Sequence, residues 1–452
     1  MVLRPPGDFW MENGVRLVIL GGGGFRVPLV HRALTRRAGL GVDEVVLHDV
    51  DARRLAAIVD VLQPAPGVRI RATTSLADAL PGADFVFSAI RVGGAEGRVR
   101  DERRALGVGV LGQETVGAGG LAYGMRTLPV ALAIARAIAE LAPDAWLINF
   151  TNPAGMITEA SRTVLGDRVI GICDSPVGLV RRACRAVGLS ESDAEADYVG
   201  INHLGWLRSL NHSGQDVLPR LLADDRTLDS FEEGRLFGAD LLRALGSIPN
   251  EYLYYYYQNA EVLAALREGP TRGEFLRDEQ AGFYAAAAAD PPRAPELWEA
   301  TRRRREESYL AEARGDDQPR DEQDLSGGGY EEVALDLMTA LSGGQPSRLI
   351  VNVPNGATLP QLPADLVIET ACLVDTSGAR PLPVAPLTLH QLGLVAAVRA
   401  AERGAIEAVT GSSRQAALRA FAIHPLVGSE RIAHALLDDL LLADPRLAAV
   451  LN

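Results

Sequence analysis

Cysteine is scarce in this 452-residue chain, and long apolar runs are missing. The three cysteines, Cys173, Cys184 and Cys372, are far apart and odd in number. They do not suggest a disulfide framework, so we expect a reducing, cytoplasmic environment. No run of 18 apolar residues is present, and the first residues lack the apolar core of a signal peptide. We therefore expect no transmembrane helix and no secretory signal.

Positive charge is also in deficit, with 45 Lys and Arg against 58 Asp and Glu and a net charge of −13 at pH 7. This balance argues against non-specific binding to nucleic acid or anionic membranes. It leaves room for an anionic small substrate, because a few buried arginines can form a positive pocket. A dense charge run at Arg302–Glu307 is more typical of a solvated helix face than of a binding patch.

The first 200 residues alternate between short apolar segments and helical segments. The segments typical of buried strands are Val15–Leu20, Val45–Leu47, Phe85–Ile90, Trp146–Phe150 and Val169–Cys173. Helical segments follow the first two, from about Pro28 to Arg37 and over Asp51–Leu62. This alternation predicts an α/β fold with a Rossmann-like, doubly wound parallel sheet in a nucleotide-binding domain over residues 1–200.

Longer helical segments dominate after residue 200, followed by a β-rich stretch at Leu349–Val374. We expect residues 201–452 to form a mixed α/β lobe that carries substrate binding and catalysis. The expected helices are Ser230–Leu245, Ala260–Arg267, Ala294–Arg314, Tyr330–Leu341, Ala396–Ala408, Arg414–Phe421 and Arg431–Leu442.

A glycine run follows the first predicted strand directly. Gly21, Gly22, Gly23 and Gly24 stand where a strand turns into a helix, which lets the backbone approach a pyrophosphate. Asp49 ends the second strand, where a carboxylate can bind an adenosine ribose. The acid favours NAD over NADP, because it would repel a 2′-phosphate.

The glycine pattern departs from G-x-G-x-x-G, because Arg26 stands in the place of the third glycine. A glycine-rich loop alone can also be a plain tight turn. The strand, the glycines and the acid together favour a nucleotide site, but they fit a dehydrogenase and a redox-using hydrolase equally well.

More specific segments follow along the chain. They are FSAIRVGGAEGR (87–98), GVLGQETVGAGGLAYGMRT (109–127), INFTNPAGMITEA (148–160), GICDSPVGL (171–179), GINHLGW (200–206), IPNEYLYYYY (248–257) and TRGEF (271–275). In this order and spacing they resemble family 4 of the glycoside hydrolases, whose members include 6-phospho-α- and 6-phospho-β-glucosidases. The resemblance covers nearly the whole chain, and the combination of NP, CDxP and NHxGW is its most specific part.

The resemblance implies a metal site. Cys173 and His203 match the two protein ligands of a divalent metal, typically Mn²⁺, whose other positions are filled by substrate hydroxyls and water. A thiolate with an imidazole suits a transition metal. Taken alone, such a pair is more often a buried thiol and a hydrogen-bonded histidine.

The resemblance also implies a catalytic set. Tyr252 matches the base, and Glu114 matches an acidic residue that helps to make this tyrosine basic. Asp174 matches the acid proposed for the leaving oxygen in phospho-α-glucosidases, with a helix N-cap as the alternative role. Phospho-β-glucosidases often carry Asn there, so Asp174 leaves the anomer open.

Family 4 is an exception to hydrolysis by two carboxylates. Its mechanism oxidises the sugar 3-hydroxyl with NAD, which acidifies the C2 proton. The base removes that proton, the C1–O bond breaks by elimination, water adds, and the hydride returns. The resemblance thus implies NAD and Mn²⁺, or another divalent metal, as cofactors and no net redox change.

Arg98, Asn152 and Arg272 match substrate-binding positions of the family. The family's usual serine after the glycines, associated with the substrate phosphate, is replaced here by Gly24. The 6-substituent is then a phosphate held by arginines, a free hydroxyl, or another anion such as the sulfonate of sulfoquinovose. Arginine pairs well with such anions through bidentate hydrogen bonds.

We expect a 6-phospho-β-glucosidase that acts on a sugar anionic at C6. The alternatives are a 6-phospho-α-glucosidase, an NAD-dependent sulfoquinovosidase, a plain NAD-dependent dehydrogenase, and a sugar sensor without catalysis. A dehydrogenase leaves the Cys173–His203 pair unexplained, and a sensor has no need of the catalytic set. Neither nucleic acid nor a membrane is expected as a partner, and the family favours a homo-oligomer, either a dimer or a tetramer.

Overall fold

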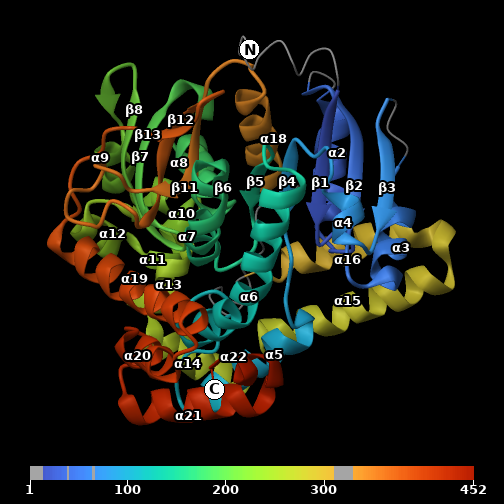
Figure 1. The fold of residues 1–452 in the computed structure, drawn as a ribbon. Coiled ribbons are helices and arrows are strands. Elements are labelled where there is room, and N and C mark those ends of the chain that lie inside the picture. Colours follow the sequence, from blue (N-terminus) through green and yellow to red (C-terminus); the bar gives the residue numbers. More distant parts are fainter. Residues whose placement is uncertain (1–13, 38–39, 64–66, 310–328, 452) are drawn as a thin grey trace.

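A single mixed sheet runs through the computed structural model, which describes residues 14–37, 40–63, 67–309 and 329–451 (Figure 1). The strand order is β10-β8-β7-β12-β11-β6-β5-β4-β1-β2-β3, with β13 beside β12 and β9 beside β8. Helices lie on both sides of the sheet and gather below it in the view of Figure 1. The sheet therefore links the two halves of the chain.

Six strands from the first half of the chain are parallel, which confirms the predicted Rossmann-like sheet. They are β1 (Val15–Leu20), β2 (Val42–His48), β3 (Arg69–Thr73), β4 (Phe85–Ser88), β5 (Trp146–Asn149) and β6 (Val169–Gly171). Three of the predicted strands, beginning at Phe85, Trp146 and Val169, end one or two residues early. Their last residues instead enter loops, and these loops matter for the site described below.

The remaining strands are antiparallel and extend the sheet beyond β6. They are β7 (Glu195–Ile201), β8 (Leu204–His212), β9 (Gln215–Asp216), β10 (Ile248–Pro249), β11 (Ser347–Pro354), β12 (Val367–Asp375) and β13 (Gly378–Pro381). Gly171 of β6 pairs with Asn352 of β11, so strands from both halves are hydrogen-bonded in one sheet. The proposed division at residue 200 stays a prediction about domains.

Helices begin and end largely where the sequence pattern places them. In the first half they are α2 (Val27–Arg36), α3 (Ala52–Val61), α4 (Leu76–Ala79), α5 (Gly94–Gly107), α6 (Gly117–Leu141), α7 (Ala154–Leu165) and α8 (Ser175–Ala186). In the second half they are α9 (Leu218–Ala223), α10 (Asp225–Asp229), α11 (Glu232–Phe237), α12 (Ala239–Leu245), α13 (Tyr254–Tyr257), α14 (Asn259–Glu268), α15 (Arg272–Ala289), α16 (Ala294–Glu307), α18 (Tyr330–Leu341), α19 (Leu389–Thr410), α20 (Arg414–Ile423), α21 (Glu430–Ala443) and α22 (Pro445–Leu451).

Three predicted helices differ from the structure. The helix expected over Ala396–Ala408 is longer and spans Leu389–Thr410 as α19. The helix expected over Ser230–Leu245 is broken into α11 and α12 at Gly238, whose φ of +75° is left-handed. The helix expected over Ala294–Arg314 ends at Glu307, and residues 310–314 of that prediction lie outside the described part.

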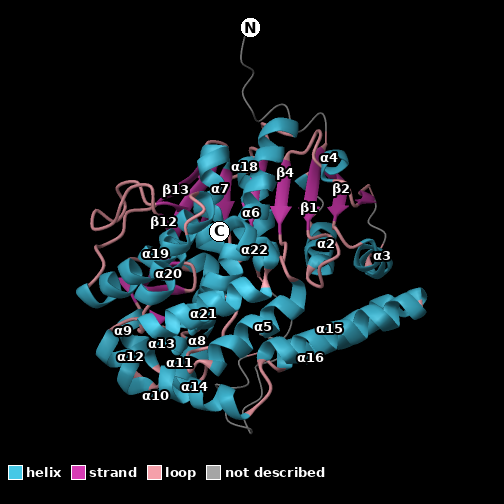
Figure 2. Ribbon diagram, turned by 60° about the horizontal axis from the view of Figure 1, so that its bottom comes forward, coloured by secondary structure: helices cyan, strands magenta, loops and turns pink. Residues whose placement is uncertain are grey.

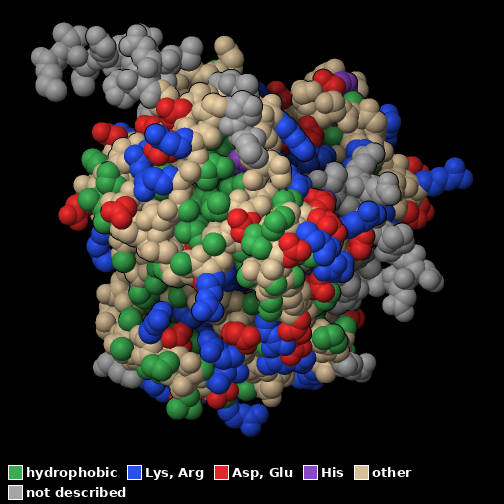
Figure 3. All heavy atoms as spheres, turned by 90° about the vertical axis from the view of Figure 1, so that its right-hand side faces the viewer, with side chains coloured by type: hydrophobic (Ala, Val, Ile, Leu, Met, Phe, Trp, Pro, Cys, Tyr) green, Lys and Arg blue, Asp and Glu red, His purple; other side chains and the backbone are tan. Residues whose placement is uncertain are grey.

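Helix α6 is the one described helix long and apolar enough to cross a membrane by length and composition. Within its most apolar window, 72% of the residues are buried inside the protein. Burial of this kind is what the central helix of a globular core also shows, and α6 packs against α5, α7 and α19. On the molecular surface, acidic and basic side chains are interspersed over the face shown in Figure 3.

Helices α15 and α16 form an antiparallel pair that lies against α3 of the Rossmann half (Figure 2). From this pair, the hydroxyl of Tyr284 donates to the carbonyl of Gly23 over 2.6 Å, and the indole N–H of Trp298 donates to that of Phe25 over 2.8 Å. Tyr330 of α18 donates to the carbonyl of Arg26 over 2.8 Å. The loop after β1 is therefore fixed from the second half of the chain.

We expect Tyr330→Phe to lower the free energy of unfolding by about 0.5–1.5 kcal/mol. The substitution leaves the ring on Phe150, at a centroid distance of 4.3 Å, but removes one of the two donors to the Arg26 carbonyl, which keeps the Leu29 amide. Urea unfolding measures the change. Tyr256→Phe is the control, because within the described residues its hydroxyl has no hydrogen bond, and it should change stability by less than about 0.5 kcal/mol. Equal effects of the two substitutions would contradict the anchoring role.

Candidate active site

The carboxyl ends of β1, β4, β5 and β6 open into a cavity of about 270 Å³, the place where ligands bind in sheets of this type. The structure brings most predicted site residues together there. Those in its lining are Gly21, Gly24, Arg98, Glu114, Asn152, Cys173, Asp174, His203, Tyr252 and Arg272. Gly22, Gly23 and Asp49 lie beside the cavity, in and opposite the glycine turn.

The glycine turn is held by Asp49. The Gly23 amide donates to its carboxylate over 2.9 Å, and the Asp51 amide donates to the other carboxylate oxygen over 3.0 Å. Gly21 has a φ of +83°, and a Cβ on Gly22 would lie 2.8 Å from the Cβ of Leu47. These positions therefore need glycine to bring the backbone close to β2.

Gly24 also lacks room for a side chain. A Cβ there would lie 2.8 Å from the Gly21 carbonyl oxygen, which accepts the Gly24 amide over 2.8 Å. A serine at this position would therefore require the turn to shift. The next residues, Phe25 and Arg26, lead into α2, where Pro28 occupies the first turn.

The predicted metal ligands lie next to each other. Cys173 follows β6, and His203 lies in the turn between β7 and β8. The Cys173 Sγ is 3.5 Å from the His203 Nε2, and both side chains are buried. The φ of His203 is +62°, a left-handed conformation that costs energy outside glycine, so the fold holds this side chain in a strained position.

This spacing fits a shared metal ion. Ligand bonds of about 2.3 Å to sulfur and 2.1 Å to nitrogen place the two atoms about 3.1–3.6 Å apart at ordinary coordination angles. Burial lowers the pKa of His203 to about 4, so the imidazole is neutral and can bind a metal. Among the described residues no cluster of three or more His, Cys, Asp or Glu side chains is placed to hold a metal. The pair would therefore leave coordination positions for substrate and water.

Tyr252 lies against this pair. It stands in a short 3-10 turn, Glu251–Leu253, after β10, and its ring stacks on that of His203 with centroids 3.8 Å apart. Burial, and then the neighbouring Glu251 carboxylate, raise the pKa of the Tyr252 hydroxyl well above its usual value. Its phenolate is thus a strong base, but one that needs a cation nearby to form.

Sequence reasoning did not single out Glu251. Its carboxylate is buried and accepts a hydrogen bond from the Ser175 hydroxyl over 2.6 Å. Burial raises the pKa of Glu251 to about 7. Its position directly before Tyr252 was the one available signal, and adjacent residues on a helical turn usually face different ways.

Asp174 occupies the N-cap position of α8, but its side chain makes no cap hydrogen bond. Its carboxylate instead lies 3.3 Å from the guanidinium of Arg26 and is partly exposed in the cavity. Asp174 therefore stands at the N-cap position without capping the helix, and its side chain faces the cavity.

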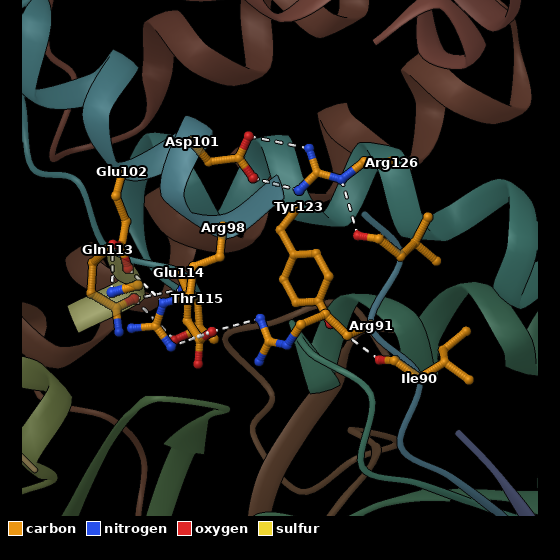
Figure 4. A network of polar contacts seen from close by, with 12 residues as sticks. Ile90, Arg91, Arg98, Asp101, Glu102, Gln113, Glu114, Thr115, Tyr123 and Arg126 are labelled. Atoms are coloured by element: carbon orange, nitrogen blue, oxygen red, sulfur yellow. Dashed lines mark hydrogen bonds and ion pairs between the residues drawn. The ribbon is translucent and has the colours of Figure 1, made fainter. Parts of the chain in front are cut away.

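Glu114 lies between two arginines in the loop before α6 (Figure 4). Its carboxylate is 2.7 Å from Arg91 and 2.7 Å from Arg98, and the Arg98 Nε also donates to Glu102 over 2.6 Å. Burial alone would raise the pKa of Glu114, but Arg91 and Arg98 overcome it and hold this pKa well below its usual range. Glu114 is therefore a carboxylate at physiological pH. Its charge also contributes to the raised pKa of Tyr252.

The predicted substrate residues Asn152 and Arg272 both line the cavity. Asn152 follows β5 and precedes Pro153 in a cis peptide. Arg272 begins α15, and its guanidinium donates to the carbonyls of Arg305 and Ser308 over 2.7 and 3.0 Å.

Arg305 also lines the cavity, although it belongs to the charge run predicted to be a solvated helix face. Most of that run is exposed or partly exposed, as expected. Nothing in a run of four arginines marks the one that turns inward. The chain contains no lysine, so arginines supply the permanent positive charges of the cavity.

We expect Glu114→Gln to lower the free energy of unfolding by about 1–3 kcal/mol at pH 7, because it removes the carboxylate from Arg91, which is partly exposed, and from Arg98, which keeps Glu102 as a partner. A carboxylate whose pKa is lowered by folding stabilises above its unfolded pKa, and this contribution fades as pH falls through about 4.3 toward the folded value. Denaturant unfolding at pH 4 and 7 should therefore show a smaller difference at pH 4. The exposed pair of Glu296 offers a control, where Glu296→Gln should change stability by less than about 0.5 kcal/mol. A pH-independent loss would contradict the ionised state of Glu114.

The chain matches two family models, the family 4 glycosyl hydrolase over residues 16–189 and the family 4 glycosyl hydrolase C-terminal domain over residues 198–427. It is 32% identical to a probable 6-phospho-β-glucosidase of Bacillus subtilis strain 168, covering 95% of this chain and 96% of that protein.

Solved structures are similar over almost the same length. The 6-phospho-β-glucosidase of Thermotoga maritima with manganese, NAD⁺ and glucose-6-phosphate gives a TM-score of 0.82 at 26% identity, covering 96% of this chain and 99% of that one. A 6-phospho-α-glucosidase from gut microorganisms, in complex with NAD and glucose-6-phosphate, gives 0.83 at 27% identity with the same coverage. The family models together span most of the sequence, and the chain belongs to family 4 of the glycosyl hydrolases.

Proposed function

We propose that this protein is a 6-phospho-β-glucosidase that hydrolyses its substrate through NAD-dependent oxidation at C3 of the sugar. The observation that carries the proposal is the stack of Tyr252 on His203, with Cys173 3.5 Å from the same imidazole, in the cavity at the glycine turn. An ordinary dehydrogenase has no use for this group. The identity to a probable 6-phospho-β-glucosidase supports the anomer and the sugar.

The cofactor positions follow from the same geometry. The turn of Gly21–Gly24 at the start of α2 would hold the pyrophosphate of NAD, and Asp49 would face its ribose. Cys173 and His203 would hold the divalent metal, and the relatives with NAD and manganese support both assignments. When bound, NAD would supply a reversible acceptor for the hydride at C3, and the metal would supply polarisation of the sugar oxygens.

The protein's own groups move the protons. The Tyr252 phenolate takes the proton from C2 of the sugar. This proton is acidic once C3 is a ketone. Asp174, exposed to the cavity, then gives a proton to the leaving oxygen as the C1–O bond breaks. Glu114 keeps a negative charge near Tyr252 and so favours proton uptake by the phenolate. Asn152 and Arg98 line the wall where the sugar hydroxyls would be held.

A second candidate is a 6-phospho-α-glucosidase. The position of Asp174 favours it, because this carboxylate faces the cavity as an acid for an α-linked leaving group would. The similar fold of a 6-phospho-α-glucosidase is compatible with it. Elimination across C1 and C2 does not by itself select an anomer, so the substrate panel below decides between the two.

Hydrolysis of 4-nitrophenyl 6-phospho-β-glucoside should stop after chelation and dialysis and return only when NAD and Mn²⁺ are both added. No NADH should accumulate, because the hydride returns to the sugar. The α-anomer and the unphosphorylated β-glucoside serve as comparison substrates, with release of nitrophenol as the measurement. Full activity without NAD or metal would refute the mechanism, faster turnover of the α-anomer would select the second candidate, and stoichiometric NADH would indicate a dehydrogenase.

Tyr252→Phe should lower kcat by at least about a hundredfold while NAD still binds, because it removes the general base. A substrate deuterated at C2 should react more slowly with the wild type, or exchange its label with solvent. Tyr256→Phe is the matched control, because it comes from the same aromatic run but does not line this cavity. A fully active Tyr252→Phe variant would assign the base to another residue.

A further inference from the structure

Arg305 differs from its neighbours on α16 in making no ion pair with a described residue. Arg302 pairs with Glu299, Arg303 with Glu307, and Arg304 with Glu279. Within the described residues, the Arg305 guanidinium takes part in no hydrogen bond or ion pair. Its nearest characterised contact is the ring of Phe25, whose centroid is 5.9 Å from the guanidinium carbon.

The surroundings of Arg305 are unfavourable for a cation. Its side chain lies on the cavity wall, where burial, then the charge of Arg26, and more weakly that of Arg272, lower its pKa to about 9. An arginine normally remains charged far above that pH. Unpaired cations of this kind are rare in protein interiors, because desolvation costs several kcal/mol unless an anion compensates.

The second cation, Arg26, is also incompletely paired. Its guanidinium lies over the rings of Tyr330 and Phe150, at 5.2 and 5.7 Å, and reaches Asp174 at 3.3 Å. Among the described residues, the Arg26 side chain makes one hydrogen bond, from Nη1 to Asp174, so its other N–H groups can donate to a ligand. The Tyr330 hydroxyl holds the Arg26 carbonyl and thereby fixes the backbone from which the side chain extends.

The backbone that carries Arg305 is fixed as well. Arg272 donates to the carbonyls of Arg305 and Ser308 at the end of α16, where helix carbonyls otherwise lack partners. Arg272 thus already acts as a positioning residue for Arg305. Arg98, the other predicted substrate arginine, is engaged by Glu102 and Glu114. Their contact with substrate stays a prediction.

We propose that Arg305 and Arg26 form the subsite for a tetrahedral oxyanion, a phosphate or a sulfonate, on C6 of the sugar. The proposal rests on the proposed function and names the residues that set its specificity. Two guanidiniums can each give two parallel N–H donors to such a group. They would take over the role for which Gly24 has neither a hydroxyl nor space. The anion in turn would neutralise the cation that α16 leaves unpaired.

The direct test measures binding without turnover. Calorimetry on the full chain with NAD and Mn²⁺ compares glucose 6-phosphate, sulfoquinovose and glucose. Arg305→Gln should weaken the binding of the preferred anionic sugar about ten- to a hundredfold and leave glucose within about twofold. Arg303→Gln removes the same charge from an exposed position of the same helix and should change neither. Arg305→Lys should fall between the wild type and Arg305→Gln.

Stability gives a second readout, which separates ligand binding from a structural role. Without ligand, Arg305→Gln should raise Tm, because it removes a partly buried cation that is repelled by Arg26. A lower Tm or a failure to fold would mean that Arg305 is structural, and would overturn the proposal. Unchanged affinity for both anionic sugars, or wild-type affinity for glucose equal to that for the anions, would overturn it too. Because these measurements need no turnover, they stand apart from a failure of the proposed hydrolysis.

Discussion

The carbonyls of Gly23, Phe25 and Arg26 accept hydrogen bonds from Tyr284, Trp298 and Tyr330, three aromatic side chains from the other half of the chain. This contact joins the proposed nucleotide turn to the helices that carry the arginines proposed to bind the sugar. It gives the Gly23 and Phe25 carbonyls side-chain donors and adds a second donor to the Arg26 carbonyl. These hydrogen bonds join residues 261 to 304 positions apart in the sequence. They fix the loop after β1 relative to α15, α16 and α18. The proposed cofactor and substrate ends of the cavity are therefore held in place by the same contacts.

Charge in the cavity is arranged in two ways. Glu114 is enclosed by Arg91 and Arg98, and Arg98 also pairs with Glu102, so two cations are balanced by two carboxylates. Around Arg305, the charges of Arg26 and Arg272 act against the cation and those of Glu306 and Glu114 favour it, but no described carboxylate forms an ion pair with it. The ion pairs of Glu114 hold Arg91 and Arg98 in the cavity wall. The positive charge of Arg305 can instead be compensated by an anionic substrate. A chain with a net charge of −13 can thus keep a local positive field for an anionic sugar.

Periodicity and motifs predicted much of this structure. The alternation of strands and helices gave the parallel sheet, and the motif set brought Cys173, His203 and Tyr252 to one place. Periodicity could not reveal the break at Gly238, which depends on a left-handed φ, nor the inward turn of Arg305, because its neighbours in the run carry the same charge. The ion pair between Arg26 and Asp174 joins residues 148 positions apart and has no local signal. The cytoplasmic location, the oligomeric state and the roles of single site residues stay predictions.

The absence of lysine from the cavity has a chemical consequence. The proposed reaction passes through a ketone at C3, and a primary amine beside a ketone condenses with it to a Schiff base. A guanidinium stays protonated and is a poor nucleophile, so it offers charge and hydrogen bonds without this side reaction. All 45 residues of the Lys and Arg class in this chain are arginines. Those that line the cavity include Arg26, Arg91, Arg98 and Arg305. In the proposed reaction, this wall would therefore be inert toward the oxidised sugar, and the chain offers no lysine side chain that could trap it as an imine.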